Sequence, residues 1–290
     1  MSYILHLLIL INIYIVLISS VNLLVGVTKL LAVSQAAFFG IGAYVTASAL
    51  INLNSSLVSI LFLVVFVTSL SSVLVALPSL RLKGDYFFLA TLGFQLIVFT
   101  VMLNWDAGTG GTFGIPGIPA LSLLGGGSIS TKEGYLVASS CLALATIGGL
   151  FTILHSPFGR VLKGIRDDEL VVASLGWNVT LYKVCAFTIS GVLCGLAGMI
   201  YACFMSYIDP TSFTLDVSIF LLSASLLGGL GNTIGPIVGA VFVVATPEII
   251  RAVGFPSSIA ANLRQIVYGM ALITLMRLRP QGILGDYHLQ

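Results

Sequence analysis

The sequence predicts an all-α protein, a polytopic bundle of transmembrane helices. Of its 290 residues, 58% are hydrophobic and only 8% are charged, and the mean hydropathy is +1.12. A soluble domain carries roughly 25% charged residues, so a water-soluble globule is excluded. The apolar residues form continuous runs and do not alternate with polar ones. Because backbone groups in lipid must be hydrogen-bonded internally, such runs are expected to be helices rather than barrel strands.

Apolar segments of membrane-spanning length recur along the chain, and we expect about nine spans (eight to ten). They cover 3–27, 32–51, 57–78, 86–104, 134–155, 184–206, 216–229, 234–250 and 263–278. No connection is polar enough to form a soluble domain, so residues 1–290 are expected to be a single transmembrane domain. The first segment lacks a basic start and is too long for the apolar core of a signal peptide, which indicates a retained span.

Two segments are interrupted by glycine. The segment 216–229 is short and runs into Gly228–Pro236, "GGLGNTIGP", so 216–250 could be one broken helix or two helices. Ser34–Tyr44, "SQAAFFGIGAY", is similarly rich in glycine. Interrupted segments in two halves of a chain are typical of a transport pathway built from repeats, whereas the alternative is that these glycines only allow close packing. A clearer packing face is formed by Gly191, Gly195 and Gly198.

Basic residues predict the orientation, because cytoplasmic loops retain Lys and Arg. If the connection 156–183 is cytoplasmic, most basic residues fall on that side. They are Lys29, Arg81, Lys83, Arg160, Lys163, Arg166, Lys183, Arg277 and Arg279. Only Lys132, Arg251 and Arg264 fall outside. The N-terminus is therefore expected outside and the C-terminus in the cytoplasm.

The sequence lacks the patterns of an enzyme. None of its five lysines follows a glycine, so the Gly-Lys of a P-loop cannot form. The four cysteines lie in apolar runs without a CxxC pair and are interpreted as buried hydrophobic residues. We expect no enzymatic activity, no catalytic residue, no metal site, no nucleic acid and no cofactor bound by this chain.

The middles of the spans contain neutral polar residues and essentially no charge. Ion-coupled transporters place Asp, Glu or His there, so an ion-coupled carrier acting alone is the less favoured alternative. Glu248 lies near the end of its span, three residues from Arg251, where a structural ion pair is expected. As pathway residues we propose Gln35, Tyr44, Gln95, Ser218 and Ser223, although such side chains more often form interhelical hydrogen bonds.

The connection 156–183 gathers charge. Six Lys, Arg, Asp or Glu residues fall within Arg160–Glu169, three basic and three acidic. Ser156-Pro157 is a typical helix start, and Gly176 a typical stop. A helical wheel puts five apolar residues on one face: Val161, Leu162, Ile165, Val172 and Leu175. We therefore expect one amphipathic helix or two short ones. Balanced charge favours a protein partner over a lipid surface, and a solvated connector is the remaining alternative.

Eight ordered blocks carry a family resemblance. They are "AVSQAAFFGIGAY" (32–44), "LRLKGDYFFLATLGF" (80–94), "TGGTFGIPGIP" (109–119), "SPFGRVLKGIRDDELVVASLGWN" (156–178), "GLAGMIYA" (195–202), "DPTSFTLDVSI" (209–219), "LGGLGNTIGP" (227–236) and "RPQGILG" (279–285). In this order they resemble the permease subunits of branched-chain amino-acid ABC importers of the LivH/LivM type, and most of all the LivM branch. The resemblance covers nearly the whole chain.

The resemblance implies a permease in the bacterial cytoplasmic (inner) membrane, in contact with membrane lipid. Its implied partners are a second homologous permease in a heterodimer, two cytoplasmic ATP-binding subunits that bind ATP and Mg, and a periplasmic or lipid-anchored solute-binding protein. The implied coupling loop contains Phe158, Gly159, Arg160, Arg166, Asp167, Asp168, Glu169 and Gly176.

Some positions depart from the family pattern. Leu170-Val171-Val172 stand where importers in general have Glu-Ala-Ala, and Gln35 stands where many relatives have His. The implied substrates are Leu, Ile and Val, although permeases for urea or short amides share these features and remain the alternative.

Overall fold

A computed structural model describes residues 2–53, 56–82, 84–122, 128–129 and 131–252, together with six single positions between 266 and 277. Most of the ninth expected span, 263–278, lies outside the described residues. Each of the other eight expected spans coincides with a helix, and 216–250 forms two helices. The prediction of a polytopic helical bundle is therefore confirmed.

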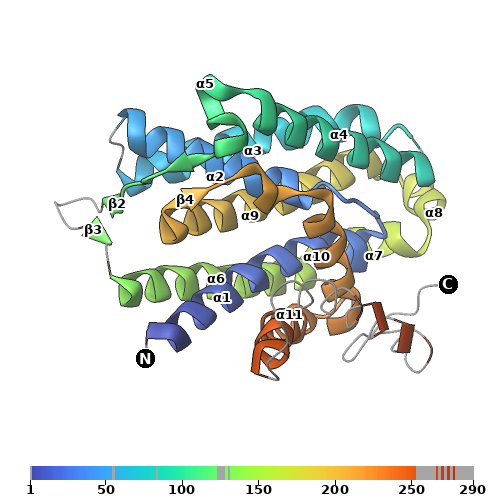
Figure 1. Cartoon of the computed structure of the whole chain (residues 1–290). Coiled ribbons are helices and arrows are strands. Elements are labelled where there is room, and N and C mark those ends of the chain that lie inside the picture. The colour runs from blue at the N-terminus through green and yellow to red at the C-terminus, as the bar shows by residue number, and fades with distance from the viewer. Residues whose placement is uncertain are drawn as a thin grey trace.

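The long helices run along one common direction of the bundle (Figure 1). They are α1 (Ser2–Asn22), α2 (Gln35–Leu53), α3 (Leu57–Ser79), α4 (Asp85–Asn104), α6 (Lys132–His155) and α9 (Val179–Met205). Two shorter apolar helices follow, α10 (Leu215–Gly228) and α11 (Gly235–Ala252). Helices α7 (Pro157–Asp167) and α8 (Glu169–Ser174) lie at one end of the bundle, which we call the α7 end.

The opposite end, which we call the β1 end, carries short irregular elements (Figure 1). They are α5 (Asp106–Thr109), η2 (Gly111–Phe113), β1 (Ile115–Pro116), β2 (Leu121–Ser122), β3 (Ser128–Ile129) and β4 (Tyr207–Ile208). The turn η3 (Pro210–Phe213) follows β4 and leads inward, so that Phe213 contacts Gln95 at the middle of α4. Strand β1 pairs antiparallel with β4, and β2 pairs antiparallel with β3. Gly114 holds φ at +68°, and a Cβ there would lie 2.1 Å from the Ile208 carbonyl oxygen, so only glycine fits beside β4.

The peripheral helices have their polar side chains inside and their apolar side chains outside. In α3 the buried positions recur every four residues and include Thr68 and Ser72, whereas Phe62 and Phe66 are 69% and 66% exposed. Helices α4 and α6 repeat this arrangement, with Gln95 and Ser139 among their buried residues. An apolar outer surface is stable against lipid and not against water. Five of the described helices, α1, α3, α4, α6 and α9, are long and apolar enough to cross a membrane.

Helices α2 and α9 pack closely at the centre of the bundle because glycines face each other. A Cβ on Gly42 would lie 2.1 Å from the Gly195 carbonyl oxygen, and one on Gly198 would lie 2.1 Å from the Phe39 carbonyl oxygen. A Cβ on Gly191 would meet Ser72 of α3 at 2.0 Å. The expected glycine face of α9 is therefore confirmed as a packing face.

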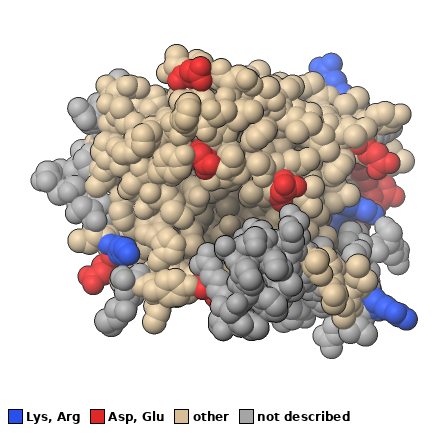
Figure 2. Space-filling view, viewed as in Figure 1, with Lys and Arg blue, Asp and Glu red and all other residues tan. Residues whose placement is uncertain are grey.

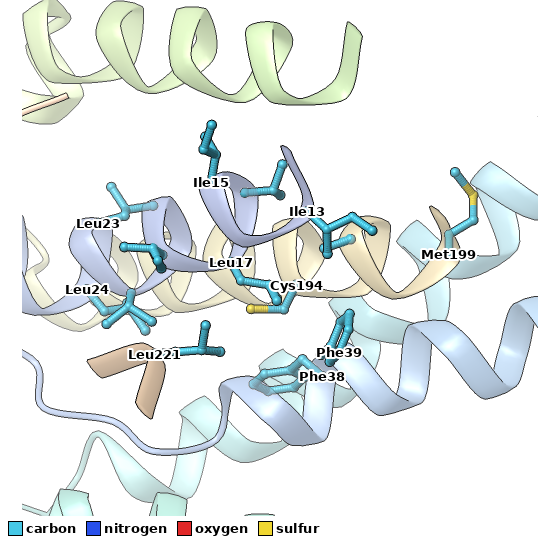
Figure 3. Close-up of a cluster of buried hydrophobic side chains, with 14 of the residues drawn as sticks. Ile13, Ile15, Leu17, Leu23, Leu24, Phe38, Phe39, Cys194, Met199 and Leu221 are labelled. Atoms are coloured by element: carbon cyan, nitrogen blue, oxygen red, sulfur yellow. The ribbon is translucent and has the colours of Figure 1, made fainter. Parts of the chain in front are cut away.

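Side chains from four helices meet in the core beside this contact (Figure 3). Leu17 of α1, Phe38 of α2, Cys194 of α9 and Leu221 of α10 point toward one another there, and all four are at most 2% exposed. Cys194 and Cys203 are thus buried packing residues, as the sequence predicts, whereas the same prediction was wrong for Cys141, which is exposed on the outer side of α6. The helix α10, although short, is fixed into the same core as the long helices.

Candidate functional site

Helix α2 begins halfway along the bundle, not at its end. Its first residues contact Gln95, which lies at the middle of α4. The segment 29–34 that leads to it is not helical, yet most of its residues are buried. Irregular backbone at membrane depth is tolerated only where protein covers it or where it lines a cavity. The start of α2 is therefore a special point of this fold.

Two predicted pathway residues cap this helix start. The Ala36 amide donates to Ser218 Oγ at 2.9 Å, and the Ala37 amide donates to Gln95 Oε1 at 2.7 Å. Ser218 Oγ also donates to Gln95 Oε1 at 3.3 Å. Gln95 Nε2 donates to the Phe213 carbonyl oxygen at 2.9 Å. We call these groups the α2 cap; it ties α2, α4 and α10 together and uses amides that a helix start otherwise leaves unpaired.

The other three predicted pathway residues lie at different places. Gln35 is 1% exposed, next to the α2 cap, and its side-chain oxygen has no hydrogen-bond partner among the described residues. Tyr44 is buried farther along α2, with its ring 5.8 Å from that of Phe213. Ser223 bonds the Ile219 carbonyl oxygen of its own helix and does not join the cap. A pathway role for these five residues stays a prediction.

Helices α10 and α11 form a hairpin whose turn, residues 229–234, packs against α1. A Cβ on Gly228 would lie 2.1 Å from the Gly235 carbonyl oxygen, so the two helices touch at the turn. Asn22 at the end of α1 donates to the Asn232 carbonyl oxygen at 2.6 Å and accepts from the Gly231 amide at 2.8 Å. The sequence analysis did not single out Asn22. A neutral polar side chain near the end of the first apolar segment was the available signal for a hydrogen bond between helices.

The connection after α6 forms two short helices, as one of the expected alternatives states. Ser156 caps α7 by accepting from the Gly159 amide, and Asp168 caps α8 by accepting from the Leu170 and Val171 amides. Leu162 and Ile165 of α7 are buried, at 0% and 4% exposure. We call α7 and α8 the coupling module.

The predicted coupling residues all lie in or beside this module. Phe158 stacks on Tyr182 with ring centroids 5.2 Å apart, and Gly159 approaches the end of α6 so closely that a Cβ would meet the Ile153 carbonyl oxygen at 2.2 Å. Glu169 pairs with Lys183 at 2.6 Å. Arg160 is exposed, and Gly176 ends the module at φ +86°. These contacts hold the module firmly on the bundle.

Arg166 joins the module to the interior. Its Nη1 donates to the Gly26 carbonyl oxygen at 3.3 Å, while its Nε pairs with Asp167 at 3.0 Å. Gly26 belongs to a π-helical turn, Leu23–Val27, that ends the first span. A Cβ on Gly26 would lie 2.4 Å from both the Gly231 amide nitrogen and the Asn22 side-chain oxygen. The module, the π-helical turn and the α10–α11 turn are thus in direct contact.

The outer face of the module carries exposed apolar side chains among its charges. The helical wheel placed Leu175 with the buried residues, and this was wrong: Leu175 is 71% exposed, whereas Val172 is buried as expected. The wheel failed because α8 ends at Ser174, and Leu175, with φ −77° and ψ 2°, lies beyond the helix as its C-cap. Leu170 and Trp177 are 78% and 47% exposed beside Leu175. An exposed apolar surface of this kind is typical of a site that binds another protein.

A cavity of about 540 Å³ lies near the β1 end, between α1, α10 and α11. Its lining includes Tyr3, Tyr14, Asp216, Phe220 and Glu248. The face in Figure 2 is hollowed near its centre, and acidic atoms lie on the rim. Sequence reasoning placed no site here; the acidic Asp216 at the start of the apolar segment 216–229 was the available signal.

Comparison with known proteins identifies relatives of the whole chain. The family model described as branched-chain amino acid transport system / permease component matches residues 3–276. The LivM permease protein of a high-affinity branched-chain amino acid transport system in Salmonella typhimurium is 34% identical over 94% of this chain and 68% of the relative. A probable LivM of Methanocaldococcus jannaschii is 27% identical over 86% of this chain and 78% of the relative.

A probable LivH permease of the same archaeon is also similar, at 24% identity over 53% of this chain and 49% of the relative. No solved structure matches the chain.

Proposed function

The chain belongs to the family of branched-chain amino acid transport permease components, and from this premise we propose how it works within an ATP-binding-cassette importer. It forms the translocation pathway for branched-chain amino acids together with a second, homologous permease. Relatives named LivM and LivH occur in one archaeon, which supports a pathway made of two related chains. As a member of this family the chain is a multi-pass membrane transport protein.

One observation carries the mechanism. Arg166 of the coupling module contacts Gly26, and the turn that contains Gly26 contacts the α10–α11 turn through Asn22 and Gly231. At its other end α10 supplies Ser218 to the α2 cap. A displacement of the module therefore reaches the start of α2, halfway across the bundle, through one short helix. Packed elements of this kind transmit motion because their contacts are discrete and not continuously deformable.

The coupling module and the missing P-loop indicate which partners the chain needs. Two ATP-binding subunits supply ATP hydrolysis, because this chain has no P-loop lysine and its family is a transport family. One of them docks on the module through the exposed apolar side chains Leu170, Leu175 and Trp177 and the charges around them. A periplasmic or lipid-anchored binding protein delivers the substrate at the opposite, β1 end.

The orientation follows from the basic residues. The α7 end faces the cytoplasm, since Arg160, Lys163, Arg166 and Lys183 belong to it. The N-terminus of α1 then lies outside, at the β1 end (Figure 1). The basic residues Arg277 and Arg279 favour a cytoplasmic C-terminus. The membrane is the cytoplasmic (inner) membrane of a bacterium.

Transport by reconstituted vesicles tests the proposal. Proteoliposomes that contain this chain, its second permease, the ATP-binding subunits and the binding protein should accumulate radiolabelled leucine only when ATP is present on the cytoplasmic side. ATP-dependent uptake of urea or acetamide in place of leucine would instead support the alternative substrate class. Vesicles with this chain alone should accumulate nothing under a proton or sodium gradient, and accumulation there would revive the ion-coupled carrier.

A further inference from the structure

The cavity near the β1 end combines an apolar wall with ionisable groups. The apolar side chains come from all three surrounding helices: Leu7, Leu10, Val217, Phe220, Val243 and Val244. The ionisable groups are His6, Asp216 and Glu248, and the described residues that line the cavity include no Lys or Arg. Its volume of about 540 Å³ is within the range of small-molecule sites, roughly 300–1,000 Å³.

The two carboxylates differ in their surroundings. Glu248 accepts a hydrogen bond from the Tyr3 hydroxyl, and this bond joins α11 to α1 in the lining of the cavity. Asp216 forms no ion pair within the part of the chain that the structure describes, and it is exposed to the cavity at the first turn of α10. Both carboxylates attract a cation that enters the cavity, and Asp216 is the one whose oxygens are not already held by the Tyr3 hydroxyl.

Asp216 also lies next to the α2 cap. Ser218, two residues later on α10, is fully buried and caps α2 from the other side of the helix. Phe220, one turn after Asp216, lines the cavity and packs edge-on against Tyr14 with ring centroids 6.3 Å apart. The first turn of α10 thus separates the cavity from the contacts that hold the start of α2. An ionisable residue at such a depth is costly unless it serves a function.

We propose that this cavity is a substrate site of the permease, in which Asp216 binds the ammonium group of an aliphatic amino acid and the apolar wall receives its side chain. The inference rests on the proposed function and adds the site and the group that it recognises. A hydrogen bond between two charged groups, a carboxylate and an ammonium, is stronger than one from the neutral N–H of an amide such as urea, which carries no positive charge. Occupation of the site acts directly on the first turn of α10.

The first experiment measures protection of a cysteine placed in the cavity. Val217→Cys is introduced into the membrane complex of the two permeases and the two ATP-binding subunits, reconstituted in nanodiscs without the binding protein. Cys141, which is exposed, is replaced by Ser. L-Leucine and 3-methylbutylamine, which both carry an ammonium, should slow alkylation at least fivefold, and 4-methylpentanoate, which lacks one, should not. Asp216→Asn should abolish the protection. Equal protection by all three compounds, or none by any, would overturn the proposal.

The second experiment separates this inference from the proposed function. In proteoliposomes with the complete importer, Asp216→Asn should raise the leucine concentration for half-maximal uptake about tenfold, in line with the loss of one charge-assisted bond. Asp106→Asn, which removes an exposed carboxylate of α5, should leave uptake unchanged. If the unmodified importer fails to take up leucine, the proposed function is wrong. If it takes up leucine and Asp216→Asn does so equally well, only the site is wrong.

Discussion

The Arg166 guanidinium donates a hydrogen bond to the backbone carbonyl of Gly26, 140 residues earlier in the chain, at 3.3 Å. The carbonyl lies in a π-helical turn at the end of the first span, where helical carbonyls lose their usual partners. Such turns are rare and often mark functional sites. Because the side chain of Arg166 is only 16% exposed, this contact is much better shielded than an ordinary surface ion pair.

The first prediction concerns this contact. Arg166→Glu should leave the protein inserted in the membrane but reduce ATP-dependent leucine uptake at least tenfold, because the coupling module loses its bond to the Gly26 carbonyl. Uptake and ATP hydrolysis are measured in the same proteoliposomes, and hydrolysis should continue.

Asp167→Asn is the matched control. It removes a second partner of Arg166, a carboxylate that is 62% exposed, and leaves the Gly26 carbonyl in place. Exposed pairs contribute at most about 1 kcal/mol, so a small effect is expected. Normal coupled uptake by Arg166→Glu would contradict the role given to this residue.

The second prediction concerns the α2 cap. Gln95→Leu removes the acceptor of the Ala37 amide and the donor to the Phe213 carbonyl, both buried. An unsatisfied buried polar group costs about 1–3 kcal/mol, so the variant should unfold at a clearly lower temperature in detergent. Ser218→Ala should lower the unfolding temperature less. In the double variant the two decreases should not add, because Ser218 and Gln95 are hydrogen-bonded to each other.

Ser223→Ala provides the comparison for this series. Its hydroxyl bonds only the Ile219 carbonyl of its own helix, so the unfolding temperature should stay close to that of the unmodified protein. Equal decreases in unfolding temperature for Ser223→Ala and Ser218→Ala would show that the α2 cap does not stabilise the fold more than a bond within one helix.

The third prediction concerns the contact of α2 with α9. Gly42→Ala would place a Cβ 2.1 Å from the Gly195 carbonyl oxygen, so the helices must separate. Forced repacking of this kind costs about 1–3 kcal/mol, and the yield of folded protein should fall. Gly148→Ala on α6 is the control, because nothing lies within 4 Å of a Cβ there. Size-exclusion profiles of the two purified variants make the comparison, and indistinguishable profiles would refute a tight contact.

The sequence was sufficient for the eight expected spans that the structure describes, because length and continuous hydropathy determine what can cross a membrane. The start of α2 was not predictable: residues 29–34 are nearly as apolar as a helix, and only burial by distant segments allows them to be irregular. The pairing of Gln95 with Ser218 joins positions 123 residues apart and has no local signal. Leu175 was misplaced for a local reason, because α8 ends at Ser174 and a helical wheel cannot continue beyond the helix end.

The last prediction concerns the exposed face of the coupling module. Leu170 is 78% exposed and has no packing role on the bundle, so Leu170→Glu should not destabilise the permease itself. It should, however, prevent co-purification of the ATP-binding subunit, because a charge would be buried unpaired in the contact.

Leu144→Glu is the contrasting variant, at a position of α6 that is 69% exposed on the outer side of the bundle. It should impair membrane insertion and leave docking of the inserted fraction intact. Undiminished co-purification with Leu170→Glu would show that the partner docks elsewhere.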